Sequence, residues 1–219
     1  MLVRRRANSF RPAEMIGIST DSPSPEIVRS VAGKIRQGAV VAIPTDTVYG
    51  LAANPFNERA VQEIFRAKRR PETLPILLLI DSMSRVEELT DGTPEDFRRL
   101  ARRFWPGPLT MVLPAASHVP QAVTAGTGTI AVRLPDSGWV RSLAGEARVP
   151  LTGTSANLSG RRTCTSAEDV NRQLGTSVPY IVNGGVARVR CPSTIVDLTA
   201  EPQILREGAI PGNTVLDSL

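Results

Sequence analysis

The stretch that most constrains this chain covers residues 60–80, AVQEIFRAKRRPETLPILLLI. Asn57 can cap a helix just before it, because an Asn side chain accepts a hydrogen bond from an early backbone N–H. Apolar residues then recur at helical spacing from Val61, which predicts one buried stripe and a helix that ends at Lys68. Pro75 opens PILLLI, a short apolar run typical of a strand buried on both faces.

A basic turn separates this helix from the strand. Arg66, Lys68, Arg69 and Arg70 place four cations close together, and Pro71 stops the helix from continuing. Fixed cations beside the low-dielectric wall of a buried sheet are suited to a polyphosphate. The alternative is a solvated helix C-terminus, where cations complement the helix dipole.

Composition fits a globular chain with an anionic partner. The 219 residues permit one large domain or two small ones, and a hydrophobic content of 41% is enough for a core. The formal net charge of +5 favours a nucleotide, RNA or an acidic protein surface as partner. An aromatic content of 4% argues against a single-strand binder built on base stacking.

Few residues are available for metal or thiol chemistry. Cys164 and Cys191 are isolated in the sequence, which predicts neither a disulfide framework nor a zinc site and fits a reducing, cytoplasmic compartment. His118 is the sole histidine, and we expect it on the surface because it lies in the loop PAASHVPQAV. A histidine-ligated metal is therefore not expected. No apolar run approaches the length of a membrane span.

Residues 1–20 form a predicted N-terminal arm. Their opening, MLVRRRANSFRPAEM, is basic and lacks the apolar segment of a secretory signal. A mobile arm is the default expectation, with an organellar transit peptide or a nucleic-acid contact as alternatives. Residues 21–219 show no repeat, linker or boundary, so we expect one α/β domain in which helices and strands are mixed irregularly.

Polar residues follow the first predicted strand, AVVAI, which comes after a helix that begins at Pro25. Pro44 ends this strand, and Thr45, Asp46 and Thr47 cluster just beyond it. In open α/β sheets ligands collect at such strand ends, so this cluster is a candidate binding site.

Arginines stand out at two further places. Arg133 lies inside the predicted strand TIAVRLP, so it either forms a salt bridge within the fold or faces a cavity that accepts an anion. A predicted helix over FRRLARRF directs its arginines away from its apolar face. They form a solvated face or, alternatively, a surface for RNA or an acidic partner.

The segment PLTGTSANLSG (150–160) offers hydroxyls and backbone N–H groups at low steric cost. Such a loop can hold phosphates and adenine edges; the alternative is an ordinary turn. Ser155 is not expected to be a nucleophile, because Asn157 interrupts the G-x-S-x-G pattern and no histidine partner is evident. Neither G-x-x-x-x-G-K-[ST] nor a complete G-x-G-x-x-G occurs.

Seven ordered blocks together resemble the threonylcarbamoyl-AMP synthase family, the YrdC-like proteins. They are PTDTVYGL (44–51), KRRPETLP (68–75), WPGPLT (105–110), AVRLPD (131–136), SANLSG (155–160), PSTIVDL (192–198) and ILREGAI (204–210). The resemblance spans about residues 24–212. It implies a twisted mixed α/β sheet with helices packed around a large positively charged cavity, in the single-domain form of the family.

The implied activity is a nucleotidyl transfer that joins L-threonine, bicarbonate and ATP into threonylcarbamoyl-AMP and pyrophosphate. This reaction precedes threonylcarbamoyladenosine formation at position 37 of tRNA, and it implies a downstream tRNA threonylcarbamoyl transferase as partner. The resemblance also implies Mg²⁺ carried with ATP, with no metal site on the protein. The alternative is a non-catalytic module of the same fold that binds double-stranded RNA or tRNA.

The resemblance also assigns roles to individual residues. Lys68 and Arg70 are the implied catalytic residues. The implied ATP-binding residues are Lys68, Arg70, Thr129, Ser155, Asn157, Thr163 and Arg206. The implied threonine-binding residues are Thr45, Thr47, Arg133 and Ser193. Three positions depart from the family pattern: Leu74 replaces a polar residue, and Leu79 and Ser137 each replace a histidine found in other members.

Overall fold

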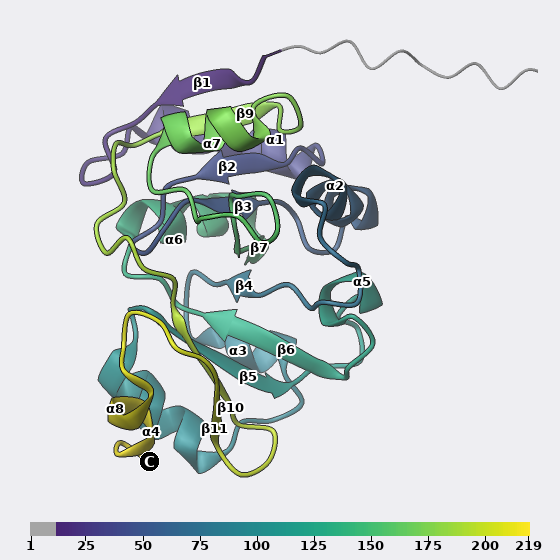
Figure 1. The fold of residues 1–219 in the computed structure, drawn as a ribbon. Helices are drawn as coiled ribbons and strands as arrows, with labels where there is room; N and C mark the ends of the chain where they lie inside the picture. Colours follow the sequence, from purple (N-terminus) through teal and green to yellow (C-terminus); the bar gives the residue numbers. More distant parts are fainter. Residues whose placement is uncertain (1–11) are drawn as a thin grey trace, which may run out of the picture.

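The protein is built from two mixed β-sheets with helices around them (Figure 1). The computed structural model describes residues 12–219. The first sheet has the order β1-β9-β2-β3-β8, with bounds Glu14–Gly17, Tyr180–Asn183, Val41–Ile43, Gly50–Ala52 and Thr154–Ser155. The second has the order β11-β10-β5-β6-β4-β7, with bounds Gln203–Arg206, Thr194–Asp197, Leu109–Pro114, Thr129–Arg133, Leu78–Leu79 and Leu151–Thr152. The mixed α/β class is confirmed, but the chain forms two sheets and not one.

Helices connect most of these strands. Their bounds are α1 Pro25–Arg36, α2 Glu58–Lys68, α3 Ser84–Leu89, α4 Glu95–Phe104, α5 Gln121–Thr124, α6 Gly138–Ala147, α7 Ala167–Leu174 and α8 Gly212–Leu216. The predicted cap of α2 is confirmed, since Asn57 Oδ1 accepts a hydrogen bond from Ala60 N at 3.2 Å. Across the described part of the chain, every helix is too short or too polar to cross a lipid bilayer.

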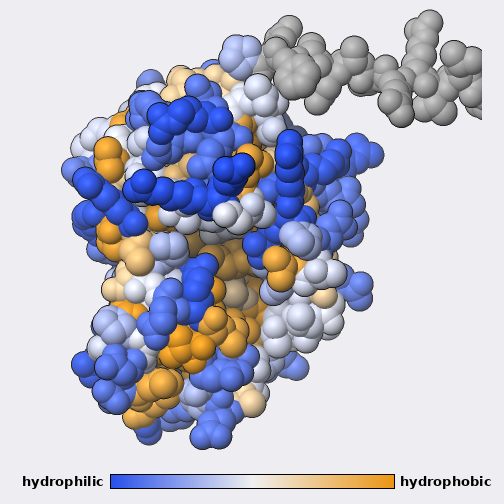
Figure 2. Space-filling model, in the orientation of Figure 1, coloured by the Kyte–Doolittle hydropathy of each residue, from blue (hydrophilic) through white to orange (hydrophobic). Residues whose placement is uncertain are grey.

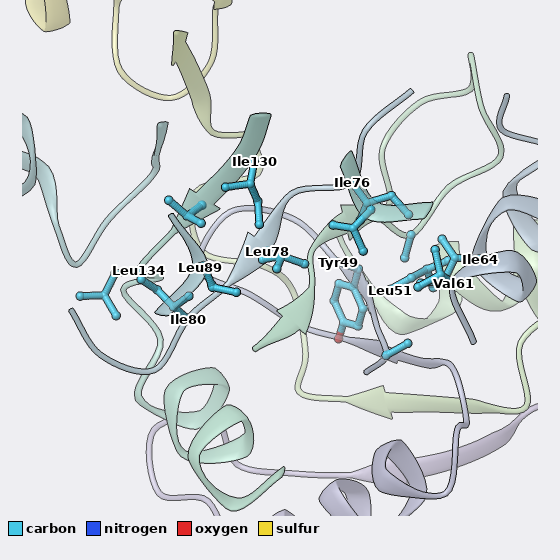
Figure 3. Close-up of a cluster of buried hydrophobic side chains, with 14 of the residues drawn as sticks. Tyr49, Leu51, Val61, Ile64, Ile76, Leu78, Ile80, Leu89, Ile130 and Leu134 are labelled. Atoms are coloured by element: carbon cyan, nitrogen blue, oxygen red, sulfur yellow. The ribbon is translucent and has the colours of Figure 1, made fainter. Parts of the chain in front are cut away.

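One hydrophobic cluster joins the two sheets. It contains Leu51 of the first sheet, Leu78 of the second and Ile64 of α2, all fully buried. Figure 3 shows these side chains gathered around Tyr49, which directly precedes β3. A separate cluster packs the buried faces of α1 and α6 against β2. Burial of these apolar stripes is the main force that fixes the elements around the space between the sheets.

The chain passes from one sheet to the other at Gly153. This residue separates β7 of the second sheet from β8 of the first, and its backbone N–H donates to Leu77 O at 2.8 Å. A Cβ atom here would lie only 2.7 Å from Leu79 Cγ, so the close approach requires glycine. The loop 150–160 is therefore part of both sheets and not a free turn.

Two predictions are wrong in extent. The arm predicted over residues 1–20 includes Glu14–Gly17, which pair in parallel with β9 as strand β1; residues 1–11 lie outside the described part of the chain. The strand predicted over PILLLI is limited to Leu78–Leu79. Ile76 N instead donates to Val123 O at 2.9 Å, outside any strand, because the preceding turn keeps this segment irregular.

Candidate functional site

A cavity of about 280 Å³ lies between the two sheets. Its wall combines the loop after β2, the basic turn after α2, the segment around β8, and strands β5, β6, β10 and β11. Figure 2 shows the surface hollowed at this level, with hydrophilic side chains above the hollow and apolar surface over β11 beside it. Ligand pockets typically have about 300–1,000 Å³, so the large size implied by the resemblance is not confirmed.

Three arginines and no carboxylate belong to the described residues that line the cavity. Arg70 Nη2 donates to Pro75 O at 2.9 Å, and Arg206 Nη2 donates to Ser193 O at 2.6 Å. Desolvation lowers the pKa of both arginines, and the nearby Arg133 adds to this at Arg206. A guanidinium group nevertheless stays protonated in proteins, so the wall favours anions.

Arg133 forms the salt bridge that the sequence left open as one of two alternatives. Its Nη1 donates to Asp46 Oδ1 and Oδ2 at 3.1 Å each, and the two side chains are only 4% and 1% exposed. The same residue lines the cavity. Its Nε is buried and has no hydrogen-bond partner among the described residues.

Hydroxyl groups from two distant segments also line the cavity. Thr45 Oγ1 donates to Val48 O at 2.7 Å and lies 2.9 Å from Thr47 Oγ1, in the loop after β2. Ser193, just before β10, has its Oγ 2.7 Å from Thr110 Oγ1 and accepts from Arg206 at 3.1 Å. Thr45, Thr47 and Ser193 are all buried, so their orientation is fixed by the fold.

The cavity has an apolar side that sequence reasoning missed. It is formed by Leu77, Val112, Ala131, Ile195 and Leu205. Val112 and Ala131 are direct neighbours across β5 and β6, and Ile195 lies on the adjoining strand β10. Strand alternation identifies such residues as facing one side of a sheet, but it cannot reveal which side carries the cavity.

Eight of the residues implied by the resemblance line this one cavity: Thr45, Thr47, Arg70, Arg133, Ser155, Thr163, Ser193 and Arg206. Three do not. Thr129 lies at the start of β6, where its hydroxyl is 2.9 Å from Thr127 Oγ1. Lys68 and Asn157 are buried behind the wall, where Lys68 Nζ donates to Asn157 O at 2.8 Å.

The three departures from the family pattern lie outside this cavity wall. Leu74 is 44% exposed on the basic turn. Leu79 is buried in the cluster formed with α1 and α6. Ser137 caps α6, because its Oγ accepts from Val140 N at 3.4 Å. None of them changes the residues that line the cavity.

A second cavity, of about 440 Å³, lies on the other side of Thr45 and Asp46 at the start of α6. The described residues of its wall include Asp21, Asp46 and Asp136 but only one arginine, Arg188, which is paired with Asp136. This balance of charge is unfavourable for a polyphosphate. The smaller cavity between the sheets is therefore the candidate site.

Other sequence expectations concern residues away from the cavity. His118 is exposed, as predicted, and its ring is stacked on Phe56 with centroids 6.3 Å apart. The arginines of α4 are also exposed, which agrees with a solvated face. Cys164 is buried and unpaired, and desolvation raises the pKa of its thiol to about 11, so it is not a reactive thiol.

Comparisons with known proteins find similar chains over most of this chain's length. The model of the family Sua5_yciO_yrdC, described as "Telomere recombination", matches residues 33–208. A threonylcarbamoyl-AMP synthase of Vibrio vulnificus is 38% identical over 183 residues, which cover 83% of this chain and 98% of that protein. A threonylcarbamoyl-AMP synthase of Pyrococcus abyssi is 43% identical over 185 residues.

The solved structure of P. abyssi Sua5 complexed with L-threonine is similar to this chain, with a TM-score of 0.91 and 39% sequence identity. The match covers 94% of this chain and 61% of the P. abyssi chain. The chain spans about half the length of the first curated relatives it matches, 54% of the P. abyssi protein and 56% of the Bacillus subtilis protein. Since the family model matches most of its length, the chain belongs to the Sua5/YciO/YrdC family.

Proposed function

We propose that this protein is an L-threonylcarbamoyladenylate synthase, which converts L-threonine, bicarbonate and ATP into threonylcarbamoyl-AMP, pyrophosphate and water. The curated relatives carry the name threonylcarbamoyl-AMP synthase, and a similar structure was solved with L-threonine. The observation that carries the proposal is the convergence of Arg70, Arg133 and Arg206 on one cavity from three distant parts of the chain.

The cavity wall carries charged, hydroxyl and apolar groups that suit these substrates. Arg70 and Arg206 face a triphosphate with full positive charges, and Ser155 and Thr163 add hydroxyl groups. Val112, Ala131 and Ile195 form an apolar surface on which a flat adenine ring can lie. The cavity therefore carries groups that are complementary to the phosphates and to the base of a nucleotide.

Arg133 is the proposed anchor of the threonine carboxylate. Asp46 engages Nη1, which leaves the second amino group, Nη2, to donate a charge-assisted hydrogen bond to a carboxylate. Thr45, Thr47 and Ser193 line the same cavity and add hydroxyl groups that can bind a small polar amino acid. Burial of Arg133 fixes the substrate geometry, because the guanidinium cannot swing into solvent.

The reaction needs no protein nucleophile. The threonine amine attacks the bicarbonate carbon, and the lost hydroxide leaves as water with a proton from the amine. A carbamate oxygen then attacks the α-phosphorus, and the bond to the bridging oxygen breaks to release pyrophosphate. Positioning and charge neutralisation by Arg70 and Arg206 are the protein's contribution to this step.

Mg²⁺ fits this cavity as part of the MgATP substrate. The lining residues supply hydroxyl and guanidinium groups and no carboxylate, and residues 12–219 contain no cluster of three potential metal ligands. The ion would keep water and phosphate oxygens as ligands, which is its usual preference. When bound, the ion would neutralise part of the negative charge of the triphosphate.

The proposal extends to the surroundings of the enzyme. Its product is an activated carbamate, so a transferase that passes it to tRNA is the expected partner, and the cytoplasm is the expected location. A non-catalytic RNA-binding module is not favoured, because the relatives are named as synthases.

The decisive assay measures pyrophosphate release with each substrate omitted in turn. We expect release only when ATP, bicarbonate and threonine are all present. Arg70→Ala should lower kcat/KM by the equivalent of about 2–4 kcal/mol, the scale of removing an electrostatic catalytic group. Arg98→Ala on α4 is the matched control and should not change the rate. Release without threonine, or equal turnover with serine, would contradict the proposal.

A further inference from the structure

Lys68 and Arg70 belong to the same basic turn but face different surroundings. Arg70 lines the cavity, whereas Lys68 is 1% exposed and is absent from the cavity wall. Arg69, between them, adopts the left-handed conformation with φ 51°, which ends α2 and redirects the chain. The turn therefore directs one cation into the cavity and the other behind it.

The Lys68 ammonium group is held by backbone carbonyls. Its Nζ donates to Ser155 O and, at 2.8 Å, to Asn157 O. Among residues 12–219 no carboxylate lies within ion-pair distance of it. A buried cation without a counter-ion is costly, so its presence calls for a role that neutral side chains cannot fulfil.

The choice of lysine agrees with this arrangement. The 26 basic residues of the chain include only two lysines, Lys34 and Lys68; the remaining 24 are arginines. A compact ammonium group can direct its N–H donors at two nearby carbonyls, whereas the planar guanidinium group needs more space. Burial also lowers the pKa of Lys68 to about 8, and the neutral amine still has two N–H donors for the two carbonyls.

Further backbone bonds hold the same loop. Ser159 N donates to Lys68 O at 2.8 Å, and Ala156 N donates to Tyr49 O at 2.7 Å. The Ser155 hydroxyl, by contrast, makes no hydrogen bond to any described residue and lines the cavity. The loop is thus fixed from behind, and its free hydroxyl points to where a ligand would lie.

We infer that Lys68 is a positioning residue, which fixes the loop 155–159 through the carbonyls of Ser155 and Asn157 so that Ser155 faces the nucleotide, and which does not itself contact the phosphates. This inference rests on the proposed function for the identity of the ligand. It reassigns Lys68 from the direct phosphate contact that the resemblance implied, and it leaves that contact to Arg70.

The test is a double-mutant cycle on MgATP affinity, measured by calorimetry with the full chain. Lys68→Met should weaken binding on the order of tenfold, the scale of one lost hydrogen bond. In the Ser155→Ala background the same change should cost less than about twofold, because the loop then has no hydroxyl to position. Arg70→Met should keep its full effect in both backgrounds. Additive losses for Lys68 and Ser155 would overturn the inference.

Salt dependence provides a second readout. Arg70→Met should reduce the dependence of MgATP affinity on ionic strength, because it removes a charge that contacts phosphate, whereas Lys68→Met should leave that dependence unchanged. Lys34→Met, at the only other lysine, is the matched control for loss of a lysine charge. A reduced salt dependence in Lys68→Met would show a direct phosphate contact and contradict the inference.

Hydrogen exchange separates this inference from the proposed function. The ligand-free Lys68→Met protein should exchange the amides of residues 155–159 faster than wild type, with unchanged exchange in α1. Unchanged exchange in the loop would overturn the positioning role even if MgATP binds. Faster exchange in Lys68→Met, together with a wild-type protein that does not bind MgATP, would support the structural link while refuting the proposed function.

Discussion

Replacement of Asp46 by alanine should be strongly destabilising. Among residues 12–219, Asp46 is the only carboxylate that pairs with Arg133, and both side chains are almost completely buried. Coulomb's law at 3.1 Å and an effective dielectric constant of about 20 gives an attraction of about 5 kcal/mol. Removing one partner of a buried pair typically costs about 3–5 kcal/mol, because the other charge stays buried without compensation. We expect a loss in this range for Asp46→Ala.

Urea denaturation followed by circular dichroism measures this loss directly. The double variant Asp46→Ala/Arg133→Met removes both charges and should recover most of the stability. Asp136→Ala is the control, because the Arg188–Asp136 pair is 66% and 54% exposed and should contribute less than about 1 kcal/mol. If Asp46→Ala costs no more than Asp136→Ala, Arg133 does not depend on Asp46 and our account of the buried pair is wrong.

Three further predictions concern other parts of the site. Burial lowers the pKa of Lys68 from 10.5 to about 8, so the unfolded chain binds this proton more tightly than the folded protein. The stability of the wild type relative to Lys68→Met should therefore rise by about 1.4 kcal/mol per pH unit between pH 8 and pH 10.5. Urea denaturation measures this difference, and a constant difference across the range would count against the prediction. Gly208→Ala would place a Cβ against the backbone of Ser193 and Thr194, so thermal denaturation should show that the free energy of unfolding falls by about 1–3 kcal/mol. Gly17→Ala is the control and should not change stability, because nothing lies near the added Cβ. Arg206→Met should weaken MgATP binding about 10–100-fold in calorimetry, the scale of a hydrogen bond to a charged group, while equal affinity would exclude Arg206 from the nucleotide site.

Local sequence signals were sufficient where neighbouring residues decide the structure. The helix from Glu58 to Lys68 follows from its cap and its apolar spacing, and the strand Val41–Ile43 follows from an apolar run ended by Pro44. The exposure of the arginines on α4 follows from the same periodicity. These features depend on contacts between residues that are close in the sequence.

Predictions failed where the partner of a segment is distant. The basic opening of the chain predicts an arm over residues 1–20, yet Glu14–Gly17 pairs with Tyr180–Asn183 at the edge of the first sheet. The short strand Leu78–Leu79 was overestimated, because pairing with Arg133 and Leu151 limits it. Strand pairing depends on tertiary context, which a single run of residues does not contain.

By itself, the sequence determined the helix Glu58–Lys68, the strand before Pro44, the polar cluster that follows it, the basic turn and the ordered blocks that identify the family. Only the tertiary structure decided that Arg133 both pairs with Asp46 and faces the cavity, and that Lys68 lies behind the wall that Arg70 lines. The physical reason is that capping and periodicity act between neighbours, whereas burial and charge pairing depend on residues that only the folded chain brings together.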